Sequence, residues 1–169
     1  MKNNMAILKL KSMEPAMLNE LSEMLINVVE DGASVGFLAP LRMKEAVEYW
    51  EQVISPGVML WIAVMEEKIV GTIQLHLAMK ANGSHRAEVA KLMVHPSYRR
   101  NGIARLLMQT VESAAKAEGR SLLILDTRLG DPSNELYKSL GYIEAGQIPN
   151  YAKSSNGHLD ATVFYYKQI

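Results

Sequence analysis

The chain has 169 residues, and its 18 Lys and Arg are balanced by 18 Asp and Glu, so the formal net charge at pH 7 is zero. A neutral chain has no overall field to attract nucleic acid or an anionic membrane, and the absence of cysteine excludes disulfides, thiolate metal sites and a cysteine nucleophile. No run approaches the roughly 20 apolar residues of a membrane span, and no signal-peptide stretch follows Met1, so we expect a cytoplasmic protein with a single domain over residues 5–169.

The first half of the chain contains both helical and strand patterns. A short strand is predicted over 7–10, and Ser12 is expected to cap a helix that continues to about Glu30. Glycines break the helical pattern over 31–37, and a second helix is expected over 43–54. The remaining predicted elements are strands over 58–65, 69–79 and 87–94, the first two joined by a hairpin turn at Glu66-Glu67.

The second half of the chain contains the longest predicted helix, over 102–118, with Gly119 as its C-terminal stop. A run over 122–126 is apolar on both faces, which is typical of a central parallel strand. Asp131-Pro132 is expected to cap and begin another helix, which ends at Gly141. The last predicted strands are 142–146 and 161–167, with a turn near Asn156-Gly157 between them. This order predicts an α/β fold with one mixed sheet and helices on both faces.

A basic turn that contains glycine joins the strand ending at Val94 to the long helix. Main-chain N–H groups and the positive end of the helix dipole are expected to meet there, which favours a phosphate. Pro96 helps to end the strand, and Gly102 lets a ligand approach the backbone closely. The spacing excludes a P-loop, which needs GxxxxGK[ST], and the GxGxxG of a dinucleotide fold. The alternative is a basic helix N-terminus capped only by water.

The run Val94-x-Pro96-x-x-Arg99-x-x-Gly102-x-Ala104 resembles the acyl-CoA pyrophosphate loop of the GNAT N-acetyltransferase superfamily. The predicted order of elements is also similar to the GNAT arrangement, in which a mixed, mostly antiparallel central sheet is flanked by helices. The resemblance implies acetyl-CoA as co-substrate, acetyl transfer to an amine, and an oxyanion held by a main-chain N–H near Val94. Arg105 either adds positive charge beside the pyrophosphate or faces solvent. The residues expected to hold acetyl-CoA are Met93, Val94, Arg99, Arg100, Asn101, Gly102, Ile103, Ala104, Arg105, Asn134 and Tyr137.

Further runs resemble the tabtoxin-resistance acetyltransferase and its relatives. They are Gly32–Phe37, Arg86–Val89, Lys91–Val94, Leu125–Thr127 and the tail residues Tyr137, Pro149 and Tyr151. Enzymes of that kind acetylate the amine of a small amino-acid-like toxin, so toxin or antibiotic resistance is the implied role. The acceptor pocket is then expected to contain Ser34, Phe37, Tyr151 and the carboxylates of Glu88 and Asp126, which suit a substrate with an ammonium group.

Glu88 and Asp126 lie near the ends of neighbouring predicted strands. Deprotonating a lysine-like amine of pKa about 10.4 costs about 4–5 kcal/mol at pH 7, and a nearby carboxylate can accept that proton. Glu88 interrupts an apolar strand, so it is either a base or substrate anchor, or the partner of Arg86 or Lys91. Asp126 followed by Thr127 also suits ordinary cap chemistry. The resemblance favours the substrate site for both carboxylates and leaves open which one is the base.

Asn134 and Tyr137 are three residues apart on one predicted helix and so share a face, which is ordinarily a packing feature. By resemblance, the Tyr137 phenol is expected to protonate the leaving thiolate, while Asn134 bonds either the pantetheine or neighbouring backbone. No metal is expected, because the four histidines lack metal-ligand spacing. They are His76, His85, His95 and His158.

Three hypotheses of function remain. The first is an N-acetyltransferase for a small amine, with direct transfer in a ternary complex because the chain has no cysteine to form an acyl-enzyme. The second keeps this chemistry but has a protein lysine or N-terminus as acceptor, which an open peptide groove would favour. The third is a non-catalytic acyl-CoA-binding sensor. No nucleic acid or membrane partner is expected, and the aromatic run Phe164-Tyr165-Tyr166 suits a sheet edge or a homodimer contact.

Overall fold

The computed structural model describes residues 4–169. Its helices are α1 (Pro15–Glu30), α2 (Met43–Glu51), α3 (Ile103–Ala117) and α4 (Ser133–Ser139), with 3₁₀ turns at Ala81–Gly83 and Pro96–Tyr98. Its strands are β1 (Met5–Leu10), β2 (Val58–Met65), β3 (Lys68–Leu77), β4 (Arg86–Val94), β5 (Leu122–Arg128), β6 (Ile143–Lys153) and β7 (Leu159–Gln168). Within residues 4–169 no helix is long and apolar enough to cross a membrane.

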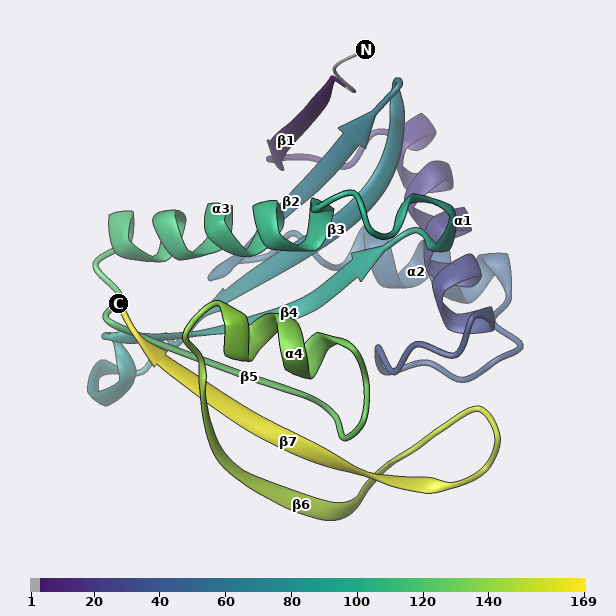
Figure 1. Cartoon of the computed structure of the whole chain (residues 1–169). Helices are drawn as coiled ribbons and strands as arrows, with labels where there is room; N and C mark the ends of the chain where they lie inside the picture. The colour runs from purple at the N-terminus through teal and green to yellow at the C-terminus, as the bar shows by residue number, and fades with distance from the viewer. Residues whose placement is uncertain (1–3) are drawn as a thin grey trace.

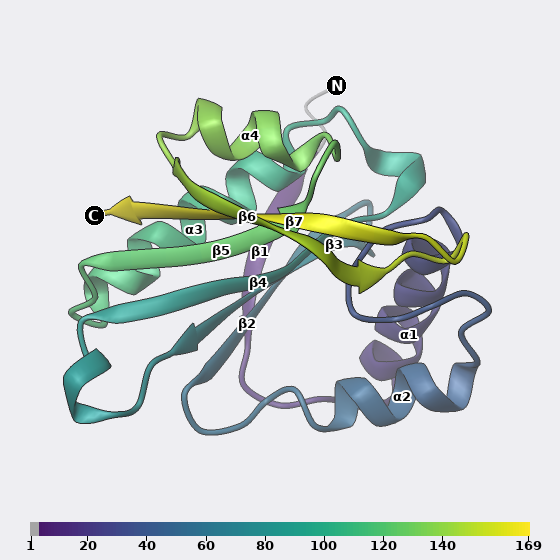
Figure 2. The same cartoon turned by 90° about the horizontal axis from the view of Figure 1, so that it is seen from below.

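The strands form one seven-stranded sheet in the order β1-β2-β3-β4-β5-β7-β6. Every neighbouring pair is antiparallel except β4 and β5, which run parallel. Figures 1 and 2 show α3 and α4 on one face of this sheet and α1 and α2 on the other. These observations confirm the predicted fold class, a mixed and mostly antiparallel sheet with helices on both faces.

Each face of the sheet has its own apolar core. Leu107 and Val111 of α3 are fully buried against one face, and Leu21 and Leu25 of α1 together with Trp50 of α2 are fully buried against the other. This arrangement follows from the helical spacing of apolar residues, which gives each helix one buried stripe. The two cores hold the sheet between two helical layers and so fix where its strand ends lie.

The helix starts differ from the sequence-based prediction at two places. The residue before α1 is Glu14, with no side-chain cap, so the prediction that Ser12 caps this helix was wrong. Pro15 occupies the first helical position instead, where its missing N–H leaves no bond unmade. Helix α4 also begins without a side-chain cap, because the Asp131 carboxylate binds Arg128. The predicted hairpin between β2 and β3 is confirmed, and its turn has the positive φ values of 51° and 63° at Glu66 and Glu67.

The last two strands are longer than the predicted 142–146 and 161–167. Strand β6 continues through Pro149, which a sequence pattern treats as a break. It can do so because β6 is the edge strand, and its register with β7 shifts between Ile148 and Ala152, where Asn150 has a φ of 53°. Every residue of β6 is exposed, so the strand lacks the buried face that would have produced an alternating pattern.

Candidate active site

Strands β4 and β5 pair over only three residues and then separate. The parallel register joins Arg86–Glu88 to Leu122–Ile124 and goes no further. Beyond Glu88, the edge of β4 that faces β5 therefore has no strand partner, and a gap opens between the two strands in the middle of the sheet. Main-chain polar groups at this point are available to a ligand, because unpaired strand edges present their N–H and C=O groups.

A bulge in β4 accompanies this separation. Thr72 of β3 is opposite Met93, and Gln74 is opposite Ala90, so Lys91 and Leu92 together are opposite one residue of β3. Lys91 has a φ of 54°, the left-handed conformation that bulges use. The extra residue reverses which side chains face which core. Val89 belongs to the α3 core and Met93 to the α1–α2 core, although simple alternation would put both on one face.

A cavity of about 1030 Å³ lies in this gap. Its walls come from the α1–α2 loop, the splayed parts of β4 and β5, the β4–α3 loop, the start of α4, and β7 with the adjoining end of β6. The predicted site residues that line it are Met93, Val94, Arg99, Arg100, Gly102, Ile103, Ala104, Arg105, Tyr137, Ser34, Glu88, Asp126 and Tyr151. Three predicted residues do not line it: Phe37, Asn101 and Asn134. Phe37 packs edge-on against Tyr49, with 5.1 Å between the ring centroids.

The β4–α3 loop opens onto this cavity with free N–H groups. Arg100 and Gly102 have φ values of 65° and 76°, and α3 begins immediately afterwards. The first helical bond joins the N–H of Leu106 to the carbonyl of Gly102, so the N–H groups of the three residues between them have no partner within the helix. A Cβ placed on Gly102 would meet nothing within 4 Å, so there is open space on that side of its Cα. This is a suitable cradle for an anion.

The basic residues of the loop have different partners. Arg99 forms an ion pair with Asp31 at the end of α1, with 2.6 Å between Nη1 and Oδ2. Arg105 donates to Ser139 Oγ of α4 at 2.8 Å, so it bridges α3 and α4. Asn101 donates its side-chain amide to the carbonyls of Tyr98 and Arg99 at 2.9 and 3.3 Å, and so holds the shape of the loop from within.

Tyr137 and Asn134 lie on one face of α4, as their spacing predicts. Asn134 donates to the carbonyls of Arg128 and Asp131 and accepts a bond from the Tyr165 hydroxyl at 2.8 Å, so its amide is fully used inside the protein. Tyr137 is 6% exposed and lines the cavity, and its hydroxyl makes no hydrogen bond with any of residues 4–169. Burial, and secondarily the charge of Asp126, raises the pKa of Tyr137 well above its usual value. The phenol therefore remains a proton donor at neutral pH.

Glu88 and Asp126 face the same cavity. Glu88 is paired in register with Ile124, and Asp126 is two residues further along β5, so both side chains are on one face of the sheet. Asp126 accepts a bond from the Thr162 hydroxyl at 2.7 Å. No cation among residues 4–169 lies within 4.0 Å of Glu88, so it forms no ion pair there with Arg86 or Lys91. Burial, then the charge of Asp126, raises the pKa of Glu88.

The sequence profile described as the acetyltransferase (GNAT) family matches residues 26–142. The chain belongs to this family. It is 36% identical over 93 residues to human N-acetyltransferase 8, a match that covers 54% of this chain and 41% of that protein. It is 31% identical over 114 residues to an uncharacterized N-acetyltransferase of Azospirillum brasilense, covering 66% of this chain and 68% of that protein. The chain thus spans less than half the length of the human relative.

Solved structures show the same fold. An N-acetyltransferase from Staphylococcus aureus Mu50 superposes with a TM-score of 0.82 at 18% identity, and the match covers 98% of each chain. GNAT acetyltransferases take their acetyl group from acetyl-CoA. We name the part of the cavity at the β4–α3 loop the donor half and the part at Glu88 and Asp126 the acceptor half, after the roles that we propose for them.

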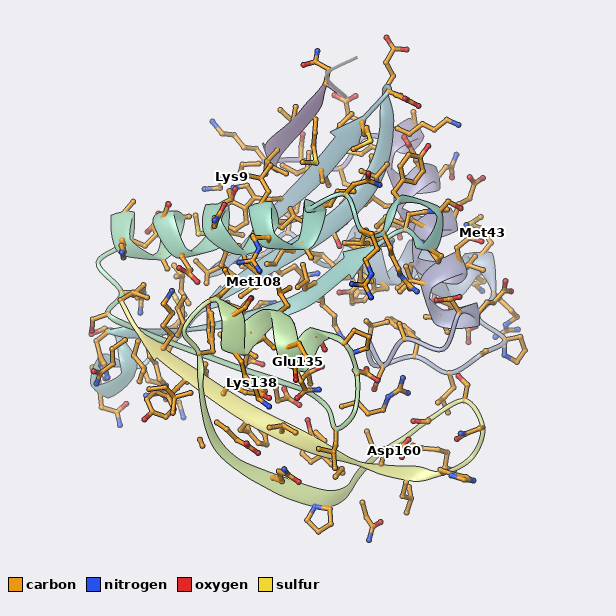
Figure 3. The ribbon with its side chains drawn as sticks, in the orientation of Figure 1. Lys9, Met43, Met108, Glu135, Lys138 and Asp160 are labelled. Carbon is orange, nitrogen blue, oxygen red and sulfur yellow. The ribbon has the colours of Figure 1, made fainter. Side chains whose placement is uncertain are left out.

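Arg128, which the sequence did not indicate, links the walls of the acceptor half. Its guanidinium donates to Asp131 Oδ1 at 2.9 Å, to Ser154 Oγ at 3.0 Å and to the carbonyl of Gly32 at 2.8 Å. Ser154 in turn donates to Asp160, which Figure 3 labels on β7. One side chain therefore joins the α1–α2 loop, the β5–α4 loop and the β6–β7 hairpin. Asp131 is only three residues from Arg128, but Ser154 and Gly32 are 26 and 96 residues away, so no local motif predicts the contacts that join these walls.

Lys91 and His76 also line the acceptor half and were not predicted as site residues. Lys91 lies at the bulge, and His76 is opposite Glu88 in the register of β3 with β4. The one available signal was Lys91 itself, a charged residue among the otherwise apolar residues 89–94. His76 Nε2 lies 2.8 Å from Gln74 Oε1, and burial followed by the charge of Lys91 lowers the pKa of this histidine.

Proposed function

We propose that residues 5–169 form one acetyltransferase domain that transfers the acetyl group of acetyl-CoA to a primary amine of a small molecule, directly and in a ternary complex. The proposal rests on one observation. A single cavity brings together a helix N-terminus with free N–H groups, the gap between β4 and β5, a buried phenol and two carboxylates. Each part corresponds to one requirement of acyl transfer from a thioester to an amine.

In the donor half, the loop from Arg99 to Arg105 would bind the pyrophosphate through its main chain, with its arginines adding positive charge. The thioester would lie in the gap, beside the main chain of Met93 and Val94, where an N–H can stabilise the oxyanion. The Tyr137 phenol would donate a proton to the departing thiolate of coenzyme A. The raised pKa of Tyr137 supports this role, because it keeps the phenol protonated.

In the acceptor half, Glu88 or Asp126 would accept the proton of the substrate ammonium, directly or through water. For an amine with a pKa near 10.4 this deprotonation costs about 4–5 kcal/mol at pH 7. The raised pKa of Glu88 supports it as the base, since a base with a pKa nearer neutrality receives the proton more readily.

A small acceptor is favoured over a protein by the closure of this half. The α1–α2 loop is joined to the β6–β7 hairpin by Arg128, which bonds both Gly32 and Ser154, and by a bond of 3.1 Å from the Ala39 N–H to Ser155 Oγ. These contacts tie the α1–α2 loop to the β6–β7 hairpin beside the acceptor half, which favours a small acceptor over an extended peptide. An amino-acid-like toxin or antibiotic, as the resemblance to the tabtoxin-resistance acetyltransferase implies, is the acceptor class that we propose.

Release of coenzyme A thiol tests the proposal. The protein is incubated with acetyl-CoA and amino acids, polyamines, aminoglycosides or a lysine-containing peptide, and calorimetry measures coenzyme A binding to the wild type and to Gly102→Glu. We expect turnover with at least one small amine, and coenzyme A binding that the substitution abolishes. Turnover of the peptide alone would support a protein acetyltransferase. Tight binding of coenzyme A without turnover of any amine would support the sensor.

A further inference from the structure

Lys91 occupies a position that the proposed reaction does not use. The bulge in β4 turns its side chain toward the α1–α2 loop, and its residue lines both the main cavity and a neighbouring cavity of about 280 Å³. His76 is the other residue that lines both. Lys91 therefore stands where the acceptor half meets this second cavity.

The ammonium of Lys91 has few partners within the protein. It donates to the carbonyl of Val35 at 2.5 Å, and the centroid of the Phe37 ring lies 5.9 Å from Nζ. A Cβ on Gly36 would come within 2.9 Å of Nζ, so a side chain larger than that of glycine would displace the ammonium. An ammonium has three donors, and only one has a partner among residues 4–169. No carboxylate of these residues lies within 4.0 Å of it.

The other basic side chains around the acceptor half are either paired with a carboxylate or mostly neutral at pH 7. Arg128 is paired with Asp131, and Arg99 is paired with Asp31. His76 has a pKa lowered from 6.5 by burial, so it is mostly neutral at pH 7. Within residues 4–169, the acceptor half thus contains the carboxylates of Glu88 and Asp126 and one half-buried ammonium, at Lys91, which feels their charge but has no carboxylate within 4.0 Å.

We propose that Lys91 binds an anionic group of the acceptor, so that the substrate is a zwitterion with a carboxylate or similar acid beside the amine that is acetylated. This inference rests on the proposed function. The two carboxylates receive the ammonium of the substrate, and Lys91 receives its acid group. A charged hydrogen bond in a partly desolvated site is stronger than one in water, so each charge discriminates against an acceptor that lacks its partner. Burial lowers the pKa of Lys91, and a bound anion would favour its charged form again.

The test compares each amino acid with its own amide and its own decarboxylated amine as acceptor, using thiol release with saturating acetyl-CoA. For the best amino acid, we expect kcat/KM to exceed that of its amide by about 10–100-fold, the discrimination that a charged hydrogen bond provides. Lys91→Met should abolish most of this ratio, and Lys91→Arg should retain it. Lys44→Met is the matched control, because Lys44 lies on α2 with its side chain 82% exposed, and it should leave both rates unchanged.

The outcomes separate the two proposals. If amines without an acid group are acetylated as well as the zwitterions, the inference about Lys91 is overturned and the proposed function stands. If Lys91→Met lowers both rates and keeps their ratio, Lys91 only supports the α1–α2 loop, and the inference is again overturned. If no amine is acetylated, the proposed function itself fails. The wild-type ratio of kcat/KM for the amino acid to kcat/KM for its amide tests the inference by itself. The inference can therefore be overturned even if Lys91→Met folds poorly.

Discussion

Replacing Tyr137 with phenylalanine removes one hydroxyl from the wall of the cavity. The substitution should disturb no other contact, because the hydroxyl makes no hydrogen bond with any of residues 4–169 and the ring is 6% exposed. Removing a buried polar group that has no partner costs little, so the free energy of unfolding should change by less than about 1 kcal/mol. A loss of activity could then not be attributed to misfolding.

The expected loss follows from the role of the hydroxyl. General acid catalysis contributes about 10²–10⁴-fold, so kcat should fall by a factor in this range. The pyrophosphate is proposed to bind main-chain N–H groups of the β4–α3 loop and not the Tyr137 hydroxyl, so the Kd of coenzyme A should stay within about threefold, which is less than 1 kcal/mol. Because the pKa of Tyr137 lies well above its usual value of 10, the wild-type rate should also show no loss of this proton donor through the neutral and mildly alkaline range.

Thiol release measures kcat, calorimetry measures the affinity for coenzyme A, and thermal unfolding measures stability. Tyr142→Phe is the matched control. Tyr142 is 4% exposed, its ring centroid lies 5.9 Å from that of Tyr137, and its hydroxyl has no partner in the described residues, yet it does not line the cavity. This control should keep wild-type kcat. If Tyr137→Phe also keeps kcat within about twofold, the assignment of Tyr137 as the acid is refuted.

Four further predictions concern Arg128, Glu88 and Gly71. Arg128→Met should raise the acceptor KM by about tenfold or more, because it removes the side chain that joins three walls of the acceptor half. The KM for acetyl-CoA should stay near wild type, and equal changes in the two KM values would contradict this role. The raised pKa of Glu88 means that kcat/KM should fall on acidification at a higher pH than an ordinary glutamate gives, and Glu88→Gln should remove this limb of the profile; an unchanged limb in the variant would make Asp126 the base. The folded state holds the proton of Glu88 more tightly than the unfolded chain does, so the protonated side chain stabilises the fold at low pH and this stabilisation is lost as pH rises. The free energy of unfolding of Glu88→Gln should lack this decline with pH. Gly71→Ala should lower stability by about 1–3 kcal/mol, seen as a lower Tm, because its Cβ would lie 3.0 Å from the Met93 carbonyl and from Ile103; an unchanged Tm would show that α3 can move away from the sheet.

Local patterns in the sequence were sufficient to predict most of the elements and the β4–α3 loop. Apolar residues at helical spacing located α1 and α3, and the Glu66-Glu67 hairpin followed from the strands beside it. The loop before α3 was also recognisable, because an anion cradle at a helix N-terminus consists of consecutive main-chain groups and one glycine. Its residues are neighbours in the chain, so their types and order already determine their geometry.

The acceptor half depended on contacts between distant residues. Arg128 bonds Gly32 and Ser154, which are 96 and 26 residues away, and the amide of Asn134 bonds Tyr165, 31 residues away. The position of Lys91 in the cavity follows from a bulge, which exists only in the register of β4 with β3. Sequence alone thus determined the periodicity, the turns and the β4–α3 loop, because those depend on backbone preferences of adjacent residues. Only the tertiary structure decided which side chains enclose the acceptor, because strand register and loop closure depend on pairing between remote segments.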